Sequence, residues 1–293
     1  MTWGFVGLGQ MGLPMALNLA KATDCRAFDR KGLAPDGLRT VSDLSGLADC
    51  THVILCLPNA AAVDDVLFGA GDLANVLNEG VLVIDTSTTS HGAALRVGDG
   101  LAERGIKFLD APISGMQKRA EDGTLTMMVG GDAVSLGAVR DILGAMANKI
   151  LHVGPVGSGQ LAKLINQLLF DINMAALAEI LPISSKLGLD PEQVTEIVNS
   201  GTGRSYASEF FLPNILKGVF DQGYPMRAAY KDLIAGAEVT AENGFPAPVL
   251  AAATATYQQA LAEGYGNEDK GAMIKVFERL IGAEFRAGAE QND

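Results

Sequence analysis

The chain has 293 residues, a length that one hydrophobic core rarely serves and that fits two domains. Its formal net charge of −12 argues against a surface for nucleic acid or anionic membrane, and no uninterrupted apolar run approaches the roughly 18 residues of a membrane span. The first residues lack the basic region of a signal peptide, and three cysteines without ligand or redox spacing argue against a disulfide framework. We therefore expect a cytoplasmic α/β or α-rich enzyme with no nucleic-acid or membrane partner.

A glycine-rich turn opens the chain. A short apolar run predicts a strand, Gly7-Leu8-Gly9-Gln10-Met11-Gly12 follows as G-x-G-x-x-G, and the apolar spacing after it predicts a helix. In this order Gly7 permits the tight turn, Gly9 lets a dinucleotide pyrophosphate approach the backbone, and Gly12 lets helix and strand pack closely. Glycine-rich turns are common, so the alternative is a purely structural turn. The flanking strand and helix, with Asp29 twenty residues after Gly9, favour cofactor binding.

Residues 1 to about 110 alternate short apolar runs with longer helical stretches, which is the pattern of a doubly wound parallel sheet. The predicted strands after the first are Cys25–Phe28, His52–Leu57, Val81–Ile84 and Ile106–Leu109. Each ends at a polar or turn cluster, and ligands of such sheets bind beyond the carboxyl ends of the strands. For Asp85 and Asp110 we favour ordinary helix capping over a role in the site. Ser114-Gly115 is instead a candidate wall of the site.

The second part of the chain is predicted to be helical. A strand over Thr124–Val129, a helix over residues 132–146 and a strand over Lys149–Val153 precede the glycine-rich segment Gly154–Gly159. Helices are then expected over Gln160–Leu187, Pro191–Asn199, Met226–Glu242, Pro246–Glu263 and Ala272–Ala283. We place the boundary near residue 155, which gives a nucleotide-binding domain over 1–155 and an all-helical domain over 156–293.

Lys163, Asn166 and Gln167 follow the glycine-rich segment at i, i+3 and i+4, which places them on one face of the predicted helix. Apolar neighbours can bury part of the lysine stem, and desolvation lowers the pKa of a lysine toward neutrality, where it exchanges protons readily. The ammonium would donate a proton to a carbonyl oxygen in reduction, and the free amine would accept a hydroxyl proton in oxidation. The alternative is a surface lysine whose stem lies over apolar neighbours.

Four separated stretches resemble the β-hydroxyacid dehydrogenase family, which includes 3-hydroxyisobutyrate dehydrogenase and tartronate semialdehyde reductase. They are Gly7–Met15, Asp110–Gly115 with Gly123–Leu125, Gly157–Lys163 with Asn166, and Lys231-Asp232-Leu233. Their order and spacing span nearly the whole chain. The resemblance implies an N-terminal Rossmann domain, a long interdomain helix, and a helical C-terminal domain that serves the substrate site and oligomerisation.

The resemblance also implies roles for individual residues. Lys163 would be the catalytic acid–base residue, and Ser114 and Gly115 would bind the substrate carboxylate. Further substrate contacts are expected at Thr124, Asn166 and Gln167. Cofactor contacts are expected at Leu57, Pro58, Thr88 and Lys231, in addition to the turn residues Gly7, Leu8, Gly9, Gln10, Met11 and Gly12.

Departures from the family pattern bear on the substrate. Met116 and Arg119 stand where the family usually has glycine, and Gln167 stands where it usually has asparagine. Arg119 adds a planar cation suited to bind a second carboxylate, a sulfonate or a phosphate of the substrate. The alternative is a surface ion pair with Glu121 or Asp122. These changes put 3-hydroxyisobutyrate itself in doubt as the substrate.

Asp29 follows the predicted second strand and favours NAD. Its carboxylate would accept hydrogen bonds from the ribose hydroxyls and repel the 2′-phosphate of NADP. Arg30 would serve that phosphate if Asp29 turned away, so NADP is the less favoured cofactor. Arg204 lies in a glycine-bearing loop, where it either reaches the site or bonds backbone carbonyls. No metal site is predicted, because three isolated histidines lack ligand spacing: His52, His91 and His152.

These residues predict an oxidoreductase that reversibly oxidises a small anionic 3-hydroxy acid to its semialdehyde with NAD, with Lys163 as general acid–base. We expect a homodimer or homotetramer. One alternative is a catalytically inactive dinucleotide-binding scaffold, which the presence of Lys163 disfavours. Another is an imine-reducing relative, but such enzymes generally lack this lysine. Decarboxylation in the manner of 6-phosphogluconate dehydrogenase would need a longer C-terminal region.

Overall fold

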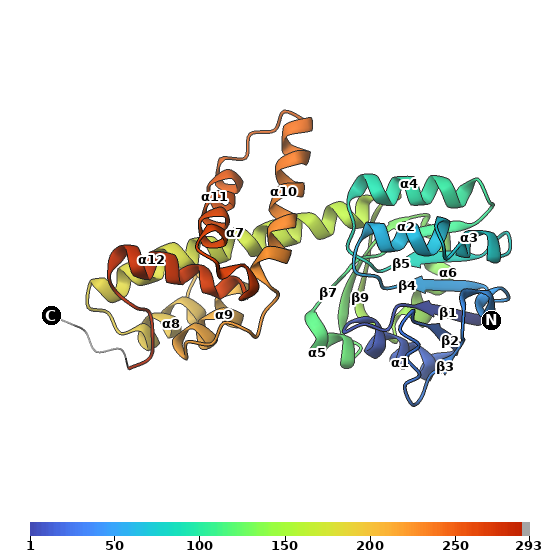
Figure 1. Ribbon diagram of the computed structural model, residues 1–293, viewed down its shortest axis with the longest axis horizontal. Helices are drawn as coiled ribbons and strands as arrows, with labels where there is room; N and C mark the ends of the chain where they lie inside the picture. Colours follow the sequence, from blue (N-terminus) through green and yellow to red (C-terminus); the bar gives the residue numbers. More distant parts are fainter. Residues whose placement is uncertain (289–293) are drawn as a thin grey trace. The chain divides into compact units, whose positions relative to one another are not determined.

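A computed structural model describes residues 1–288, and the chain divides into two compact units, Met1–Lys163 and Leu164–Asp293. Figure 1 shows a sheet flanked by helices in the first unit and a group of helices in the second. The division falls inside the long helix α7 (Ser158–Lys186). A mostly parallel sheet followed by a helical unit confirms the predicted fold class.

Within the described residues the sheet has nine strands in the order β3-β2-β1-β4-β5-β6-β8-β7, and β9 pairs with β8. The strands are β1 (Thr2–Val6), β2 (Asp24–Phe28), β3 (Arg39–Thr40), β4 (His52–Leu55), β5 (Leu82–Asp85), β6 (Lys107–Asp110), β7 (Ile113–Ser114), β8 (Leu125–Gly131) and β9 (Ala147–Gly154). Pairing is parallel from β3 through β6, as predicted for residues 1 to about 110, whereas β8, for which no direction was predicted, runs antiparallel to β6 and β7. The segment between β7 and β8 is shorter than the dozen or so residues that a parallel crossover needs.

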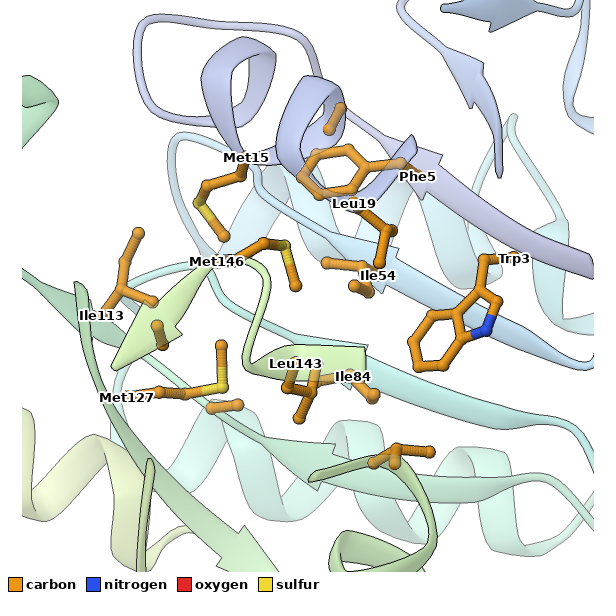
Figure 2. Packing of buried hydrophobic residues seen from close by; sticks show 14 of the residues in the cluster. Trp3, Phe5, Met15, Leu19, Ile54, Ile84, Ile113, Met127, Leu143 and Met146 are labelled. Atoms are coloured by element: carbon orange, nitrogen blue, oxygen red, sulfur yellow. The ribbon is translucent and has the colours of Figure 1, made fainter. Parts of the chain in front are cut away.

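Helices cover both faces of this sheet, because successive strand residues point to opposite sides and both sides are apolar. The helices are α1 (Gly12–Ala22), η1 (Leu44–Leu47), α2 (Ala60–Phe68), α3 (Leu73–Val76), α4 (His91–Ala102), α5 (Met116–Glu121) and α6 (Ala133–Leu143). Phe5 and Ile54 pack with Met15 of α1 and Leu143 of α6, as Figure 2 shows. Their strand neighbours pack on the other face with residues of α2 and α4. The carboxyl ends of β1, β4, β5 and β6 therefore share one edge of a rigid layer.

The second unit has its own apolar core. Its elements after α7 are α8 (Pro191–Ser200), α9 (Tyr206–Leu216), α10 (Met226–Glu242), α11 (Pro248–Ala262), η2 (Tyr265–Asn267), η3 (Lys270–Met273) and α12 (Ile274–Ile281). Buried side chains of α7, α9, α10, α11, η3 and α12 meet there, among them Met174, Phe211, Leu233, Tyr257 and Met273. Helices α10 and α11 pack against each other along their length (Figure 1). The unit therefore provides a stable base for the polar residues that α7 and α10 carry.

Two helical segments differ from the sequence expectation. No helix was predicted over α9, in which Pro213 is an internal residue that lacks a backbone donor and usually ends a helix. The helix begins with a capping box formed by Ser205 and Ser208, which satisfies its first N–H groups. The helix predicted over Ala272–Ala283 is divided between η3 and α12.

Among the described residues, α7 is the helix that is long and apolar enough to cross a membrane by length and composition. Its most apolar window has a mean hydropathy of 1.4, and 28% of that window is buried. The core helix of a soluble protein meets the same criterion, so these two properties are weak support for a membrane span.

Candidate cofactor and catalytic site

Gly7 and Gly12 hold the glycine-rich turn in a form that excludes larger side chains. Gly7 has a φ of +99°, and a Cβ there would lie 2.4 Å from the carbonyl oxygen of Cys56. A Cβ on Gly12 would lie 1.9 Å from the carbonyl oxygen of Gly7, so α1 can begin this close to β1 only with glycine. Gly9 is exposed, and a Cβ there would meet no atom within 4 Å. The open space therefore lies where the motif brings the backbone to a pyrophosphate.

Among the residues that the structure describes, the turn also has backbone donors without a protein partner. Within residues 1–288, three consecutive N–H groups make no hydrogen bond, namely those of Gly9, Gln10 and Met11. Unpaired N–H groups before a helix of full length are suited to bind phosphate oxygens. The turn residues thus fit the pyrophosphate of a dinucleotide.

Asp29, at the end of β2, is bonded to the turn. Its Oδ2 accepts a hydrogen bond from the N–H of Leu8 at 2.9 Å, and its Oδ1 accepts one from the N–H of Lys31 at 2.8 Å. Arg30 is exposed beside it. The carboxylate predicted to bind a ribose is therefore held in a fixed orientation next to the glycine turn.

The loops after β4 and β5 are bonded to each other. The N–H of Leu57 donates to Oγ of Ser87 at 2.8 Å, and the N–H of Ser87 donates to Oδ1 of Asp85 at 2.9 Å. Burial raises the pKa of the Asp85 carboxyl to about 7. Thr88 lies half-buried in the second loop, and Pro58 is exposed in the first. Four of the predicted cofactor segments therefore end at the same edge of the sheet.

Asp110, at the end of β6, caps the start of α7. Its Oδ1 accepts a hydrogen bond from the N–H of Gly157 at 2.7 Å, and its Oδ2 accepts one from the N–H of Gln160 at 2.9 Å. The side chain is fully buried, and burial raises its pKa. A capping role was favoured for Asp110 and these contacts confirm it, although the capped N–H groups lie 47 and 50 residues later and not in the next helix. Lys163 lies one turn further along α7 and is 9% exposed.

Asn166 and Gln167 lie on α7 in the second unit. Nδ2 of Asn166 donates to Oε1 of Gln167 at 3.3 Å, and Nε2 of Gln167 donates to Oδ2 of Asp232 at 3.4 Å. Asp232 is buried on α10, whereas its neighbour Lys231 is exposed. Sequence reasoning quoted Asp232 in a motif but gave it no role. The available signal for a role of Asp232 was its position directly after Lys231, a predicted cofactor contact.

Ser114, Gly115 and Met116 form a constrained turn between β7 and α5. Ser114 pairs with Thr126 of β8. Gly115 has a φ of +143°, and a Cβ there would lie 2.9 Å from both Cβ and Cδ of Arg119. Met116 has a φ of +60°, a left-handed conformation that destabilises residues other than glycine by roughly 1–2 kcal/mol. The strain lies beside the predicted carboxylate site, at a position where the resemblance leads us to expect glycine.

Arg119 is held by the loop that follows it. Its Nη2 donates to the carbonyl oxygen of Thr124 and lies 3.5 Å from Oδ1 of Asn148. The N–H of Thr124 donates in return to the carbonyl oxygen of Arg119 at 2.9 Å. Asp122, one of the ion-pair partners considered for Arg119, pairs with Lys118. The guanidinium therefore has a fixed position beside Gly115, with Nε and Nη1 unbonded in the described part of the chain.

The remaining residues singled out in the sequence have structural contacts. Arg204 pairs with Glu209, with Nε 2.6 Å from Oε1. The ring of His52 stacks on that of Trp3. Nδ1 of His91 lies 3.1 Å from the carbonyl oxygen of Gly157. Nε2 of His152 lies 2.8 Å from the carbonyl oxygen of Gly131. These contacts agree with the structural roles expected for the histidines.

Family models match both parts of the chain. Residues 2–154 match the NAD-binding domain of 6-phosphogluconate dehydrogenase, and residues 157–277 match the NAD-binding model of NADP-dependent 3-hydroxyisobutyrate dehydrogenase. Together the two matches cover the strand-edge loops, the start of α7 and the helices of the second unit.

Individual relatives span almost the full length. The 2-(hydroxymethyl)glutarate dehydrogenase of Eubacterium barkeri is 37% identical over 293 residues, covering 97% of either chain. The mitochondrial 3-hydroxyisobutyrate dehydrogenase of Drosophila melanogaster is 36% identical, covering 91% of this chain and 86% of the relative. Among solved structures, the 3-hydroxyisobutyrate dehydrogenase of Mycobacterium tuberculosis with L-serine superposes with a TM-score of 0.84, at 31% identity, over 94% of this chain and 98% of that one.

Proposed function

This chain belongs to the β-hydroxyacid dehydrogenase family and is an NAD(P)-dependent oxidoreductase, and from this premise we propose that it oxidises a small 3-hydroxy acid reversibly to its semialdehyde, with Lys163 as general acid–base. The observation that carries the proposal is the buried Lys163 one turn after the Asp110 cap of α7. The cap fixes the start of the helix at the strand edge where the cofactor loops end. A lysine held there serves proton transfer better than a solvated surface lysine would.

Different residues of this chain would bind the cofactor, transfer the proton and bind the substrate. The glycine turn and Asp29 would hold the dinucleotide, whose bound nicotinamide supplies hydride acceptance from the carbinol carbon. Lys163 takes the hydroxyl proton in oxidation and returns a proton to the carbonyl oxygen in reduction. Ser114 and Gly115 would bind the carboxylate, with Thr124 close by. Asn166 and Gln167 would bind the substrate through amides whose orientation Asp232 sets.

A dinucleotide-coupled absorbance screen tests this function. Purified protein is assayed with NAD and with NADP on 3-hydroxy acids that carry either one or two acidic groups, and on matched 2-hydroxy acids. We expect turnover on at least one 3-hydroxy acid and much lower turnover on its 2-hydroxy isomer. Activity on 2-hydroxy acids alone, or reduction of imines alone, would contradict the proposal.

We propose further that the substrate carries two acidic groups. Arg119 supports this, because its guanidinium is fixed beside Gly115 and keeps donors unbonded on Nε and Nη1. The relative named 2-(hydroxymethyl)glutarate dehydrogenase takes its name from a dicarboxylate, which supports the same class. Arg119→Ala is expected to lower kcat/KM about tenfold on a dianionic substrate, the effect of one charge-assisted hydrogen bond, and much less on a monoanionic one. Steady-state kinetics on the two substrates measures the difference.

Lys118→Ala is the matched control for Arg119→Ala. Lys118 is a neighbouring cation on α5, but it is exposed and paired with Asp122. We expect it to leave the ratio between the two substrates unchanged. Equal losses on both substrates in Arg119→Ala would show that the guanidinium only supports the loop through Thr124.

We propose NAD as the preferred form of the cofactor. Asp29 is fixed by Leu8 and Lys31, so its carboxylate stays near the position of a 2′-phosphate, which it would repel. We expect a higher kcat/KM with NAD than with NADP, and a fall of about tenfold in that preference in Asp29→Ala. Asp36→Ala, at an exposed acid of the same segment, should keep the preference. A wild-type preference for NADP would refute the assignment.

Three further features complete the proposal. The functional boundary lies near residue 155, with the nucleotide-binding domain over 1–155 and the substrate and oligomerisation domain over 156–293. The separate family matches, to residues 2–154 and to residues 157–277, support this boundary. The protein acts in the cytoplasm as a homodimer or homotetramer. Light scattering after size-exclusion chromatography measures the oligomer, and a monomer at assay concentration would contradict that part.

A further inference from the structure

The side-chain amide of Gln160 lies in the first turn of α7 and is 2% exposed. Its Oε1 accepts a hydrogen bond from the backbone N–H of Thr89 at 3.0 Å, and its Nε2 donates one to the carbonyl oxygen of Ser87 at 2.9 Å. A backbone N–H can only donate and a backbone carbonyl can only accept, so these partners fix the orientation of the amide. One side chain thus bonds the loop after β5 on both sides of Thr88.

The same residue is connected to two other strand ends. Its backbone N–H donates to Oδ2 of Asp110, at the end of β6, at 2.9 Å. Through Ser87, whose Oγ accepts from the N–H of Leu57 at 2.8 Å, the contact extends to the loop after β4. Gln160 therefore joins the segments that carry Leu57 and Thr88 to the helix turn that carries Lys163.

We infer that Gln160 is a positioning residue that holds the first turn of α7, and with it Lys163, at a fixed distance from the loop around Thr88. The inference rests on the proposed function, in which Thr88 contacts the cofactor and Lys163 transfers the proton. Hydride and proton must leave neighbouring atoms of one substrate, so the two groups have to keep their relative position. A displacement of about 1 Å can lower the rate of such a reaction by about 10²-fold.

Gln160→Met tests the inference, because methionine has a similar length and makes neither hydrogen bond. We expect kcat to fall by about 10- to 100-fold, with the KM of the hydroxy acid changed much less. Binding of the reduced cofactor, followed by its fluorescence, is expected to weaken several-fold, since the loop around Thr88 loses its support. This second measurement needs no substrate. An unchanged cofactor affinity together with a kcat near the wild-type value would overturn the inference.

Gln160→Glu supplies a readout that a merely structural role would not move. When protonated, the introduced carboxyl donates to Ser87 and accepts from Thr89 as glutamine does, whereas the ionised form cannot donate. Its kcat/KM relative to wild type is therefore expected to rise as the pH falls, and the ratio for Gln160→Met to stay flat. The other titratable groups nearby are shared with wild type and cancel in the ratio: Asp85, His91, Asp110 and Lys163. A flat ratio for Gln160→Glu would count against the inference.

Asn78→Leu is the control for loss of a side-chain amide contact at an exposed position outside the site. Asn78 donates to the carbonyl oxygen of Ala48 at 3.0 Å and precedes β5, away from the strand ends that carry the site. It should lower the melting temperature without the change in kcat. If Asn78→Leu and Gln160→Met lose kcat equally at equal melting temperature, Gln160 only stabilises the fold. A wild-type protein that turns over no hydroxy acid would instead refute the proposed function, and cofactor binding would still decide on Gln160.

Discussion

Replacing Lys163 with alanine is expected to lower kcat by about 10²-fold or more, the loss typical of removing a positioned acid–base group. Without the amine, the hydroxyl proton of the substrate has no fixed acceptor as the hydride leaves. The change leaves the proposed carboxylate contacts at Ser114 and Gly115 and the glycine turn untouched. The KM values of substrate and cofactor should therefore change much less than kcat. Steady-state kinetics on the best substrate of the screen measures both.

Two further variants sharpen this expectation. Lys186→Ala, at the exposed end of α7, is the matched control and should retain normal turnover. Lys163→Arg keeps the charge but cannot release its proton, so we expect a loss in oxidation close to that of Lys163→Ala. Near-normal kcat in Lys163→Ala, with cofactor binding intact, would remove Lys163 from the mechanism.

The family and the cofactor turn could be predicted because they depend on local requirements. A G-x-G-x-x-G motif between strand and helix needs glycine for reasons of backbone space, and the close approaches at Gly7 and Gly12 show that requirement directly. The family resemblance is confirmed by matches over both parts of the chain. That Asp110 caps a helix could be expected from its place at a strand end, but the first N–H group that it caps lies 47 residues later, which the local sequence does not indicate.

The contacts of Gln160 and Arg119 could not be predicted from the sequence. The partners of Gln160 lie 71 and 73 residues earlier and become neighbours only through the pairing of the sheet. Arg119 had several acceptors within reach, and the turn at Gly123, with a φ of +67°, brings the carbonyl oxygen of Thr124 to it in place of the acids considered. The contacts of Gln160 depend on long-range geometry, and the contact of Arg119 depends on which of several similar local acceptors the loop brings to it.

The helices and strands were likewise predictable where they depend on local sequence, and not where they depend on distant contacts. Apolar runs ended by polar clusters identified the parallel strands, and the predicted bounds of α10 agree with the structure. The direction of β8 is not a local property, because it depends on the length of the connection after β7 and on which strand it meets. Helix α9 was missed because Pro213 argues against a helix locally, while tertiary packing of Phe211 and Leu212 favours it.

The second unit also contains a buried ion pair that the sequence analysis did not identify. Lys270 of η3 is 1% exposed and donates to Oδ1 of Asp171, which is fully buried on α7. The hydroxyl of Tyr257 donates to the same oxygen at 3.2 Å, and the ammonium lies 4.1 Å from the ring centroid of Phe170. Burial raises the pKa of the Asp171 carboxyl to about 6 even though Lys270 opposes that shift. Desolvation therefore outweighs the attraction between the two charges.

Lys270→Met is expected to lower the free energy of unfolding of the second unit by about 3–5 kcal/mol, because it leaves a buried carboxylate without its cation. The double variant Asp171→Leu with Lys270→Met should recover most of that loss, since a buried apolar pair replaces both charges without desolvation. Far-UV circular dichroism during urea unfolding measures the helices. Trp3, the chain's one tryptophan, reports on the first unit by fluorescence and should show a much smaller shift. If the double variant is as unstable as the single one, the ion pair contributes net stability, because the attraction between its charges more than offsets the desolvation of both groups.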